Sequence, residues 1–288
     1  MEKLILIKDE LFNSNLFLKK VEEAKMSLDF SGFSFDCYEY LSIEIKNKIF
    51  NLAQQSHNII SLVSSFTKIQ KINDSEIEDS SSIASADVAG IANHLGQGKV
   101  SMIHFDAHAD TGEDQFGALV GHGTPMRNLI ANGHVRGDRF LQLGLRGYWP
   151  DDATLNWMRD QGMRSYEMTE IHHRGLTAVL DESFATLIDG CDGVFLSVDI
   201  DVVDPGMAPG TGTPEPGGMT SRELLEAVRR ICLELPIVGI DVVEVAPPFD
   251  TADITAILAN RVVLEALSAI AKRRSGGIYS ATQNLLDR

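Results

Sequence analysis

The sequence has little cysteine and no long apolar run. Its 288 residues include three cysteines, Cys37, Cys191 and Cys232, and they form no C-x-x-C pair. This scarcity argues against a disulfide framework and favours a reducing compartment. No apolar run reaches the roughly 18 residues of a membrane span, and the first residues lack the apolar stretch of a secretory signal. We therefore expect a cytoplasmic protein with no membrane partner.

Basic residues are also in the minority. The chain has 25 lysines and arginines against 41 aspartates and glutamates, which gives a formal net charge of −16. A nucleic-acid-binding protein needs a basic face, so we expect no nucleic-acid partner. The negative field instead attracts cations. The length and the 44% hydrophobic share are sufficient for one large domain or two small ones with a sizeable core.

Arginine and glycine are nearly missing from the first part of the chain. Residues 1–86 hold nine lysines, no arginine and one glycine, whereas residues 87–288 hold two lysines, fourteen arginines and 23 glycines. The change indicates either a boundary between two structural units or a junction of two parts with different origins. The polar, serine-rich stretch 73–87 is typical of a linker or an exposed loop. Before it, apolar patterns predict strands at 3–7 and 57–63 and a helix at 16–26.

The second part alternates short apolar runs with helical patterns. The runs that we predict as strands are 100–105, 140–145, 193–200 and 237–245. Thr220 and Glu223 form a capping box before a predicted helix over 220–235, and Asp253 is expected to cap a last helix over 254–273. The last helix has apolar residues at helical spacing, namely Ile254, Ile257, Leu258, Leu264 and Leu267. Continuous apolar strands between helices predict an α/β fold with a mostly parallel sheet covered on both faces.

Three of the predicted strands end in acidic residues. These are Asp106 and Asp110, with His108 between them, then Asp199 and Asp201, and finally Asp241 and Glu244. Residues two positions apart on an extended strand point the same way, so each Asp-x-His or Asp-x-Asp can aim two ligands into one space. Ligands of parallel sheets bind beyond the carboxyl ends of the strands, which is where these residues lie.

A metal centre explains this pattern better than a set of solvated turns. One Asp-x-Asp at a strand end is usually a loop or capping pair, but here two such patterns each follow a buried strand. Burying like charges is costly unless a cation pairs with them. Oxygen ligands with one imidazole favour a divalent ion such as Mn²⁺. Four aspartates and one histidine are enough for two ions bridged by carboxylates.

Other polar residues are weaker candidates. His122 lies between glycines in the loop 121–125, where a histidine suits proton transfer near neutral pH, although an ordinary turn histidine gives the same pattern. We expect His104 on the strand face opposite the neighbours of Asp106, as a core histidine, and His172 and His173 on a surface turn. The Gly/Pro-rich segment 208–220 lacks the G-K-[ST] of a phosphate-binding loop and is predicted to be a pocket wall. Further candidates to line the pocket are Arg146, Tyr148, Met207 and Glu215.

Three segments resemble the signature segments of the ureohydrolases, the family of arginases, agmatinases and related guanidino-compound hydrolases. They are "FDAHAD" (105–110), "SVDIDVVDPGMAPGTGTPEPGG" (197–218) and "DVVEVAPPFD" (241–250). The similarity runs from about Asp87 to Arg274. The segment "GTGTPEPGG", with its Glu, resembles the agmatinase-like branch more than the true arginases. The resemblance implies a three-layer α/β/α fold in which 87–288 form a metal-binding catalytic domain. Residues 1–86 are then an atypical segment that is part of this domain or fused to it.

The resemblance also implies a dimanganese centre. Asp106 and Asp199 would bridge two Mn²⁺ ions, His108 and Asp201 would bind one of them, and Asp110 would bind the other. A hydroxide that bridges the ions would attack the guanidinium carbon of a small cationic substrate, with agmatine the first choice.

The same resemblance gives roles around the substrate. Asp110 would help to hold the hydroxide, His122 would deliver a proton to the leaving amine, and Glu244 would bind the guanidinium by charge-assisted hydrogen bonds. The products would be urea and an amine. Family members are usually trimers or hexamers, so a homo-oligomer is expected.

One metal ligand of the family is replaced in this chain. The family has a further histidine in a G-G-D-H-S segment upstream, which falls on "EDSSSI" (78–83) and places Ser81 at the histidine position. His57 lies too far upstream to replace it. Because a neutral hydroxyl is a poor ligand for Mn²⁺, we predict a weakened metal site on the Asp110 side and low or absent activity.

Two alternatives to a working hydrolase follow from the sequence. A ureohydrolase-like chain that keeps the fold without turnover would account for Ser81 and for the unusual residues 1–86. A deacetylase with the same general fold is a third interpretation, although the paired motifs and "EVAPP" fit ureohydrolases better. Among ureohydrolase substrates, agmatine, guanidinobutyrate and arginine differ in the tail, and the sequence does not identify the residue that contacts the tail.

Overall fold

The computed structural model describes residues 33–35, 61–63, 82–113, 122–148 and 150–280. The predicted strand 3–7, the predicted helix 16–26 and Ser81 lie outside these residues. Within the predicted strand 57–63, the described part is β2 (Ser61–Val63), which pairs in parallel with β1 (Phe33–Phe35). The division of the chain at residue 86 stays a prediction.

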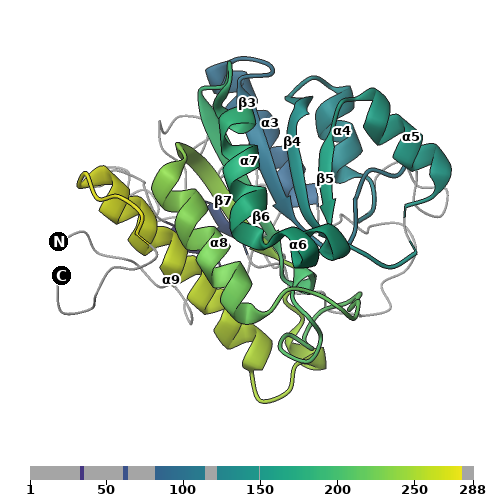
Figure 1. Ribbon diagram of the computed structural model, residues 1–288, viewed down its shortest axis with the longest axis vertical. Helices are drawn as coiled ribbons and strands as arrows, with labels where there is room; N and C mark the ends of the chain where they lie inside the picture. The colour runs from purple at the N-terminus through teal and green to yellow at the C-terminus, as the bar shows by residue number, and fades with distance from the viewer. Residues whose placement is uncertain (1–32, 36–60, 64–81, 114–121, 149, 281–288) are drawn as a thin grey trace, which may run out of the picture.

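A five-stranded sheet forms the centre of the second part (Figure 1). Its strands, in spatial order, are β5 (Arg164–Glu167), β4 (Val135–Leu145), β3 (Val100–Phe105), β6 (Gly193–Asp199) and β7 (Ile237–Val243). All four strand pairs are parallel. Every residue of β3 and β6 is buried, as their continuous apolar runs predict. The predicted α/β class with a parallel central sheet is therefore confirmed.

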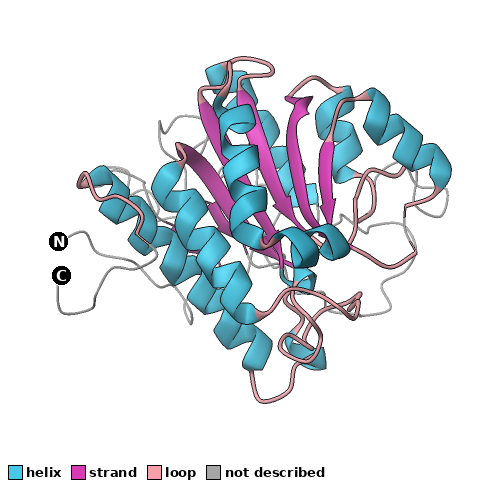
Figure 2. Ribbon diagram, viewed as in Figure 1, coloured by secondary structure: helices cyan, strands magenta, loops and turns pink. Residues whose placement is uncertain are grey.

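Helices cover both faces of this sheet, so the molecule has three layers (Figure 2). On one face, α3 (Ser82–Leu95) and α4 (Pro125–Ala131) pack on Met102. On the other face, α7 (Leu176–Ile188), α8 (Ser221–Glu234) and α9 (Ile254–Arg274) pack on Ile103 and Phe105. Alternate residues of β3 thus face opposite layers. The remaining helices of the described residues are α5 (Asp152–Asp160) and α6 (Met168–Arg174), with short 3₁₀ turns at Ile200–Val202 and Pro247–Phe249.

The order of the strands reverses between β3 and β6. From β3 the chain continues to β4 and β5 on one side, and it then crosses to β6 and β7 on the other side. The segments that follow β3 and β6 therefore leave adjacent strands in opposite directions. In open α/β sheets, this is the place where ligands bind.

Several predicted boundaries need correction. β4 begins at Val135, earlier than the predicted 140, because polar residues alternate with buried ones at its start. The sequence pattern does not predict β5, whose four residues have a single buried position, Tyr166. His172 and His173 are exposed, as expected, but they lie in the last turn of α6 rather than in a turn between elements.

The two predicted helix starts differ in outcome. Thr220 and Glu223 form the capping box at the start of α8, with both reciprocal hydrogen bonds present, as predicted. Asp253 was the wrong cap for α9, because its side chain makes no capping hydrogen bond and its backbone is left-handed, with φ of 56°. Asp250 caps the helix instead: its carboxylate accepts the N–H groups of Thr255 over 3.1 Å and of Ala256 over 3.0 Å.

The buried face of α9 also differs from the predicted one. Ile254, Ile257 and Leu264 are exposed, whereas Leu258 is buried with other small and apolar residues of the helix. By length and by a mean hydropathy of 1.6, α9 is the one helix of the described residues that could cross a membrane. Length and composition alone are weak evidence for that, because one face of α9 forms part of the core beside α8.

Candidate metal centre and active site

Carboxylates at this edge of the sheet accept hydrogen bonds from backbone N–H groups, and one of these bonds links the segment after β3 to the segment after β6. The N–H of Ala107 donates to Oδ1 of Asp201 over 3.0 Å, and the N–H of His108 donates to Oδ1 of Asp106 over 2.6 Å. Asp110 has a φ of 53°, a left-handed conformation that few residues other than glycine, asparagine and aspartate adopt. The chain therefore turns sharply at Asp110 and brings its side chain back toward β3.

Asp106, His108 and Asp201 form a first group of potential metal ligands. One ligand atom from each lies within 4.8 Å of the others. Nδ1 of His108 is 3.0 Å from Oδ2 of Asp201 and 3.4 Å from Oδ1 of Asp106. The hydroxyl of Thr213 donates to Oδ2 of Asp201 over 3.3 Å. Both carboxylates are buried, while His108 is partly exposed.

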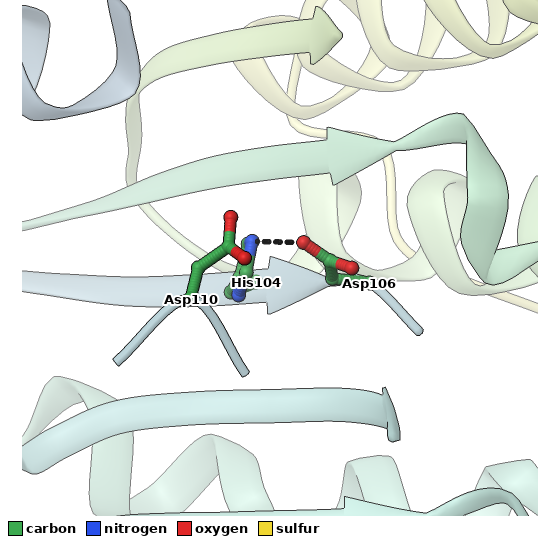
Figure 3. A group of neighbouring side chains, drawn as sticks. All are labelled: His104, Asp106 and Asp110. Atoms are coloured by element: carbon green, nitrogen blue, oxygen red, sulfur yellow. Dashed lines mark ion pairs between the residues drawn. The ribbon is translucent and has the colours of Figure 1, made fainter. Parts of the chain in front are cut away.

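Asp110 forms a second group with His104 and Asp106. Figure 3 shows the three side chains converging at the end of β3, with Nε2 of His104 3.0 Å from Oδ2 of Asp106. His104 is a buried histidine with hydrogen-bond partners, as predicted. Residues 104 and 106 are two positions apart and share one face of the strand, so His104 lies beside Asp106 and opposite its chain neighbour Phe105. The two-residue spacing was the signal in the sequence that the His104 side chain lies beside that of Asp106.

Asp199 lies beside these groups but belongs to neither of them. It ends β6, is buried, and accepts the N–H of Asp201 at its Oδ1 over 2.9 Å. Burial and the charges of Asp201 and Asp106 raise the pKa of Asp199 well above its usual range. Burial and Asp106 do the same to the pKa of Asp110. The carboxylates at this edge of the sheet therefore repel one another unless a cation balances them.

The first group, Asp106, His108 and Asp201, also brings two buried carboxyl groups close together. Burial and the charge of Asp106 raise the pKa of Asp201 to about 6. Burial acts in the same direction on Asp106, but His104 and His108 outweigh it and hold the pKa of Asp106 below its usual range. Burial lowers the pKa of His108, yet hydrogen bonds to Asp106 and Asp201 dominate and raise it to about 11. A positive charge is thus strongly favoured between these two carboxylates, and a metal ion competes with the proton for that place.

This donor set fits divalent manganese. Carboxylate oxygens with one imidazole suit hard and borderline divalent ions, and the buried, mutually repelling carboxylates supply the negative charge that binds them. The residues that would hold the ions are Asp106, His108, Asp110, Asp199 and Asp201.

His122 and Glu244 approach each other across the site. Nδ1 of His122 is 3.3 Å from Oε1 of Glu244. The histidine is partly exposed in the loop before α4, and the glutamate is buried just after β7, with a φ of 62°. A buried carboxylate beside an accessible imidazole provides both a site for a cationic group and a group that exchanges protons with solvent.

The segment 203–220 follows the end of β6, and hydrogen bonds from Arg146 hold it in place. Nη2 of Arg146 donates to the carbonyl oxygens of Asp201 over 2.6 Å and of Glu215 over 2.7 Å. Arg146 is therefore a structural clamp rather than a free cation for a substrate. Of the other predicted pocket residues, Tyr148 is almost fully exposed and Met207 is exposed.

The sequence of this chain matches the model of the arginase family over residues 80–269. The chain belongs to the arginase family. The matched region contains the whole sheet and all the residues of the candidate metal centre, and it includes Ser81. Members of the arginase family use a binuclear manganese centre, which agrees with the two groups of potential ligands here.

Curated relatives of this arginase-family chain act on several guanidino compounds. The chain is 41% identical over 175 residues to a guanidinobutyrase of Pseudomonas aeruginosa, covering 60% of this chain and 53% of the relative. It is 43% identical over 176 residues to a guanidinopropionase of the same organism, covering 60% and 54%. An agmatinase of Gallus gallus is 39% identical over 175 residues, covering 60% and 50%. The chain thus spans about half the length of the curated relatives it matches.

Solved structures of the arginase family share this fold. Proclavaminate amidino hydrolase from Streptomyces clavuligerus has a TM-score of 0.64 and 31% identity, covering 79% of this chain and 71% of that chain. An arginase from Bacillus caldovelox has a TM-score of 0.63 and 27% identity, covering 78% and 74%.

Proposed function

We propose that this chain hydrolyses a guanidino compound to urea and an amine. The observation that carries the proposal is the cluster of buried carboxylates that meets His108 at the carboxyl ends of the adjacent strands β3 and β6. Family membership supports the reaction class. Two bound Mn²⁺ ions would supply positive charge and an acidified water at this place.

The chain's own residues account for the rest of the chemistry. Glu244 is buried, and its carboxyl group would hold the substrate guanidinium by charge-assisted hydrogen bonds. Asp110 would help to orient the attacking water. When the carbon–nitrogen bond breaks, the leaving nitrogen needs a proton, and His122 would deliver it because its ring is both within reach of Glu244 and open to solvent. Guanidinium and water then give urea and an ammonium product.

Agmatine is the substrate that we propose first. Its tail ends in an ammonium group, which the negative charge of the chain favours. Arg146 and Arg127 are already engaged: Arg146 binds backbone carbonyls, and Arg127 stacks on Trp157 and donates to the carbonyl of Thr111. A free arginine would instead have favoured a substrate with a carboxylate tail. Guanidinobutyrate is the second candidate, because a guanidinobutyrase is among the curated relatives.

Urea release decides between these substrates. The purified chain with added Mn²⁺ is incubated with agmatine, guanidinobutyrate, guanidinopropionate and arginine, and the initial rates are compared. We expect the highest kcat/KM for agmatine. Binding of Mn²⁺ without urea from any of the four would instead support the inactive chain that Ser81 suggests. Activity on an acetyl-lysine peptide would favour the deacetylase interpretation. A homo-oligomer and a cytoplasmic location remain part of the proposal.

A further inference from the structure

A row of polar side chains crosses the sheet just before the metal-site segments begin. The register pairs His104 of β3 with Gln142 of β4 on one side and with Ser197 of β6 on the other. The row continues to Ser165 of β5 and to Asp241 of β7. Paired residues on neighbouring strands share one face, and this is the face that α3 and α4 cover. A polar row inside an apolar sheet is costly unless its members satisfy one another.

Only one assignment of the amide oxygen and nitrogen of Gln142 satisfies its neighbours in this row. Its Nε2 lies 2.6 Å from the carbonyl oxygen of Ala109 and 3.3 Å from Nδ1 of His104. Ser165 donates its hydroxyl to Oε1 of Gln142 over 3.0 Å. A backbone carbonyl only accepts hydrogen bonds, so the atom that faces Ala109 is the amide nitrogen. Because Gln142 is completely buried, a flipped amide would leave that carbonyl without a donor.

The orientation of Gln142 determines the tautomer of His104. The second N–H of the amide points at Nδ1 of His104, which accepts it only when Nδ1 carries no proton. The neutral ring then has its proton on Nε2 and donates it to Oδ2 of Asp106 (Figure 3). A protonated nitrogen does not bind a metal ion. His104 is therefore a hydrogen-bond donor to Asp106, although its distance from Asp106 and Asp110 would also suit a metal ligand.

We infer that Gln142, assisted by Ser165, positions the metal ligands Asp106 and Asp110 from behind the site. One amide group acts on both of them. Through His104 it orients the carboxylate of Asp106, and through the carbonyl of Ala109 it holds the peptide before Asp110, where the backbone is left-handed. Groups that hydrogen-bond to metal ligands fix their orientation and strengthen binding. The inference rests on the proposed function only in taking Asp106 and Asp110 as metal ligands.

Two variants of His104 separate a donor from a metal ligand. In His104→Gln, an amide N–H can take the place of Nε2–H, but the amide is a poor replacement for a ligating imidazole. His104→Leu removes both functions. Calorimetric titration with Mn²⁺ is expected to give the wild-type stoichiometry for both variants. The affinity should fall by roughly 10–100-fold in His104→Leu and stay within a few-fold of wild type in His104→Gln. Loss of one ion per chain in both variants would make His104 a ligand and overturn the inference, as would an unchanged affinity in His104→Leu.

A second pair of variants tests Gln142 itself. Gln142→Glu keeps the shape of the side chain but removes both N–H donors. Gln97→Glu makes the same change at an exposed position and serves as the control. We expect Mn²⁺ affinity to fall by roughly 10–100-fold in Gln142→Glu alone. Equal affinities in the two variants would contradict the proposed role.

The tautomer of His104 can be measured without metal or substrate. Long-range proton–nitrogen NMR spectra of the metal-free chain report which ring nitrogen carries the proton. We expect it on Nε2, both in the wild type and in Ser165→Ala, which leaves the Gln142 N–H groups in place. A proton on Nδ1 would overturn the inference. This measurement gives an answer even if the chain releases no urea, so it distinguishes failure of this inference from failure of the proposed function.

Discussion

Nδ1 of His122 lies 3.3 Å from Oε1 of Glu244, although the two residues are 122 positions apart in the sequence. One comes from the loop before α4 and the other from the turn after β7, and the sheet brings both to its carboxyl edge. The pair joins a group that can receive a guanidinium to a group that can exchange a proton.

Replacing His122 tests its role in proton delivery. If the chain releases urea, His122→Asn should lower kcat by roughly 100-fold or more, because the leaving nitrogen loses its proton donor. The variant should bind Mn²⁺ as the wild type does, since His122 belongs to neither ligand group. His173→Asn, on the exposed last turn of α6, is the matched control and should keep full activity. A normal kcat in His122→Asn would exclude the proposed role.

Manganese titration tests the consequence of Ser81. We expect the wild-type chain to bind two Mn²⁺ ions with unequal affinities, because the resemblance places Ser81 at the position of a ligand histidine of the family. Ser81→His should strengthen the weaker site by roughly tenfold or more. Ser80→His places the same side chain one position away and should have no such effect. Two equally tight sites in the wild type would refute the prediction.

The stability of α9 should depend on Asp250 rather than on Asp253. Asp250→Ala removes the acceptor for two N–H groups of the first turn and should cost about 1 kcal/mol of unfolding free energy. Asp253→Gly removes no capping hydrogen bond and relieves a left-handed backbone, so it should be neutral or slightly stabilising. Thermal or urea unfolding of the two variants gives the comparison. A larger loss in Asp253→Gly would show that the cap was assigned to the wrong residue.

Asp241 should make the stability of the protein depend on pH. It is completely buried in β7, beside Ser197 of the neighbouring strand β6. Burial raises the pKa of Asp241 from 3.8 to about 7, with a smaller contribution from the charge of Asp87 in α3, while Ser197 and His104 oppose the rise. A raised pKa in the folded state means that the stability present at low pH is lost as the pH rises toward about 7.

The variant Asp241→Asn removes this ionisation. We expect it to be more stable than the wild type above pH 7, by up to about 4 kcal/mol, and to lose that advantage below about pH 4. The exposed Asp192→Asn, at the opposite end of the sheet, is the control for the loss of one charge. Denaturant unfolding at several pH values measures the difference, and parallel pH profiles for Asp241→Asn and wild type would contradict it.

The sequence by itself determined the fold class, the approximate places of the long strands and the clustering of acidic residues at the strand ends. Continuous apolar runs are buried on both faces, so they predict a parallel sheet, and the two-residue spacing of Asp106 and His108 places both at one strand end. The capping box of α8 was equally predictable, since it is a contact between residues three positions apart.

Only the tertiary structure decided which distant groups meet. Gln142 and Ala109 are 33 positions apart, and nothing in their local sequence indicates that an amide of β4 supports the peptide before Asp110. The cap of α9 and its buried face were mistaken for the same reason, because the packing of a helix against its neighbours selects among several residues that local spacing allows. Local patterns fix which residues share a face, whereas the register of the sheet and the packing of its layers fix what that face contacts.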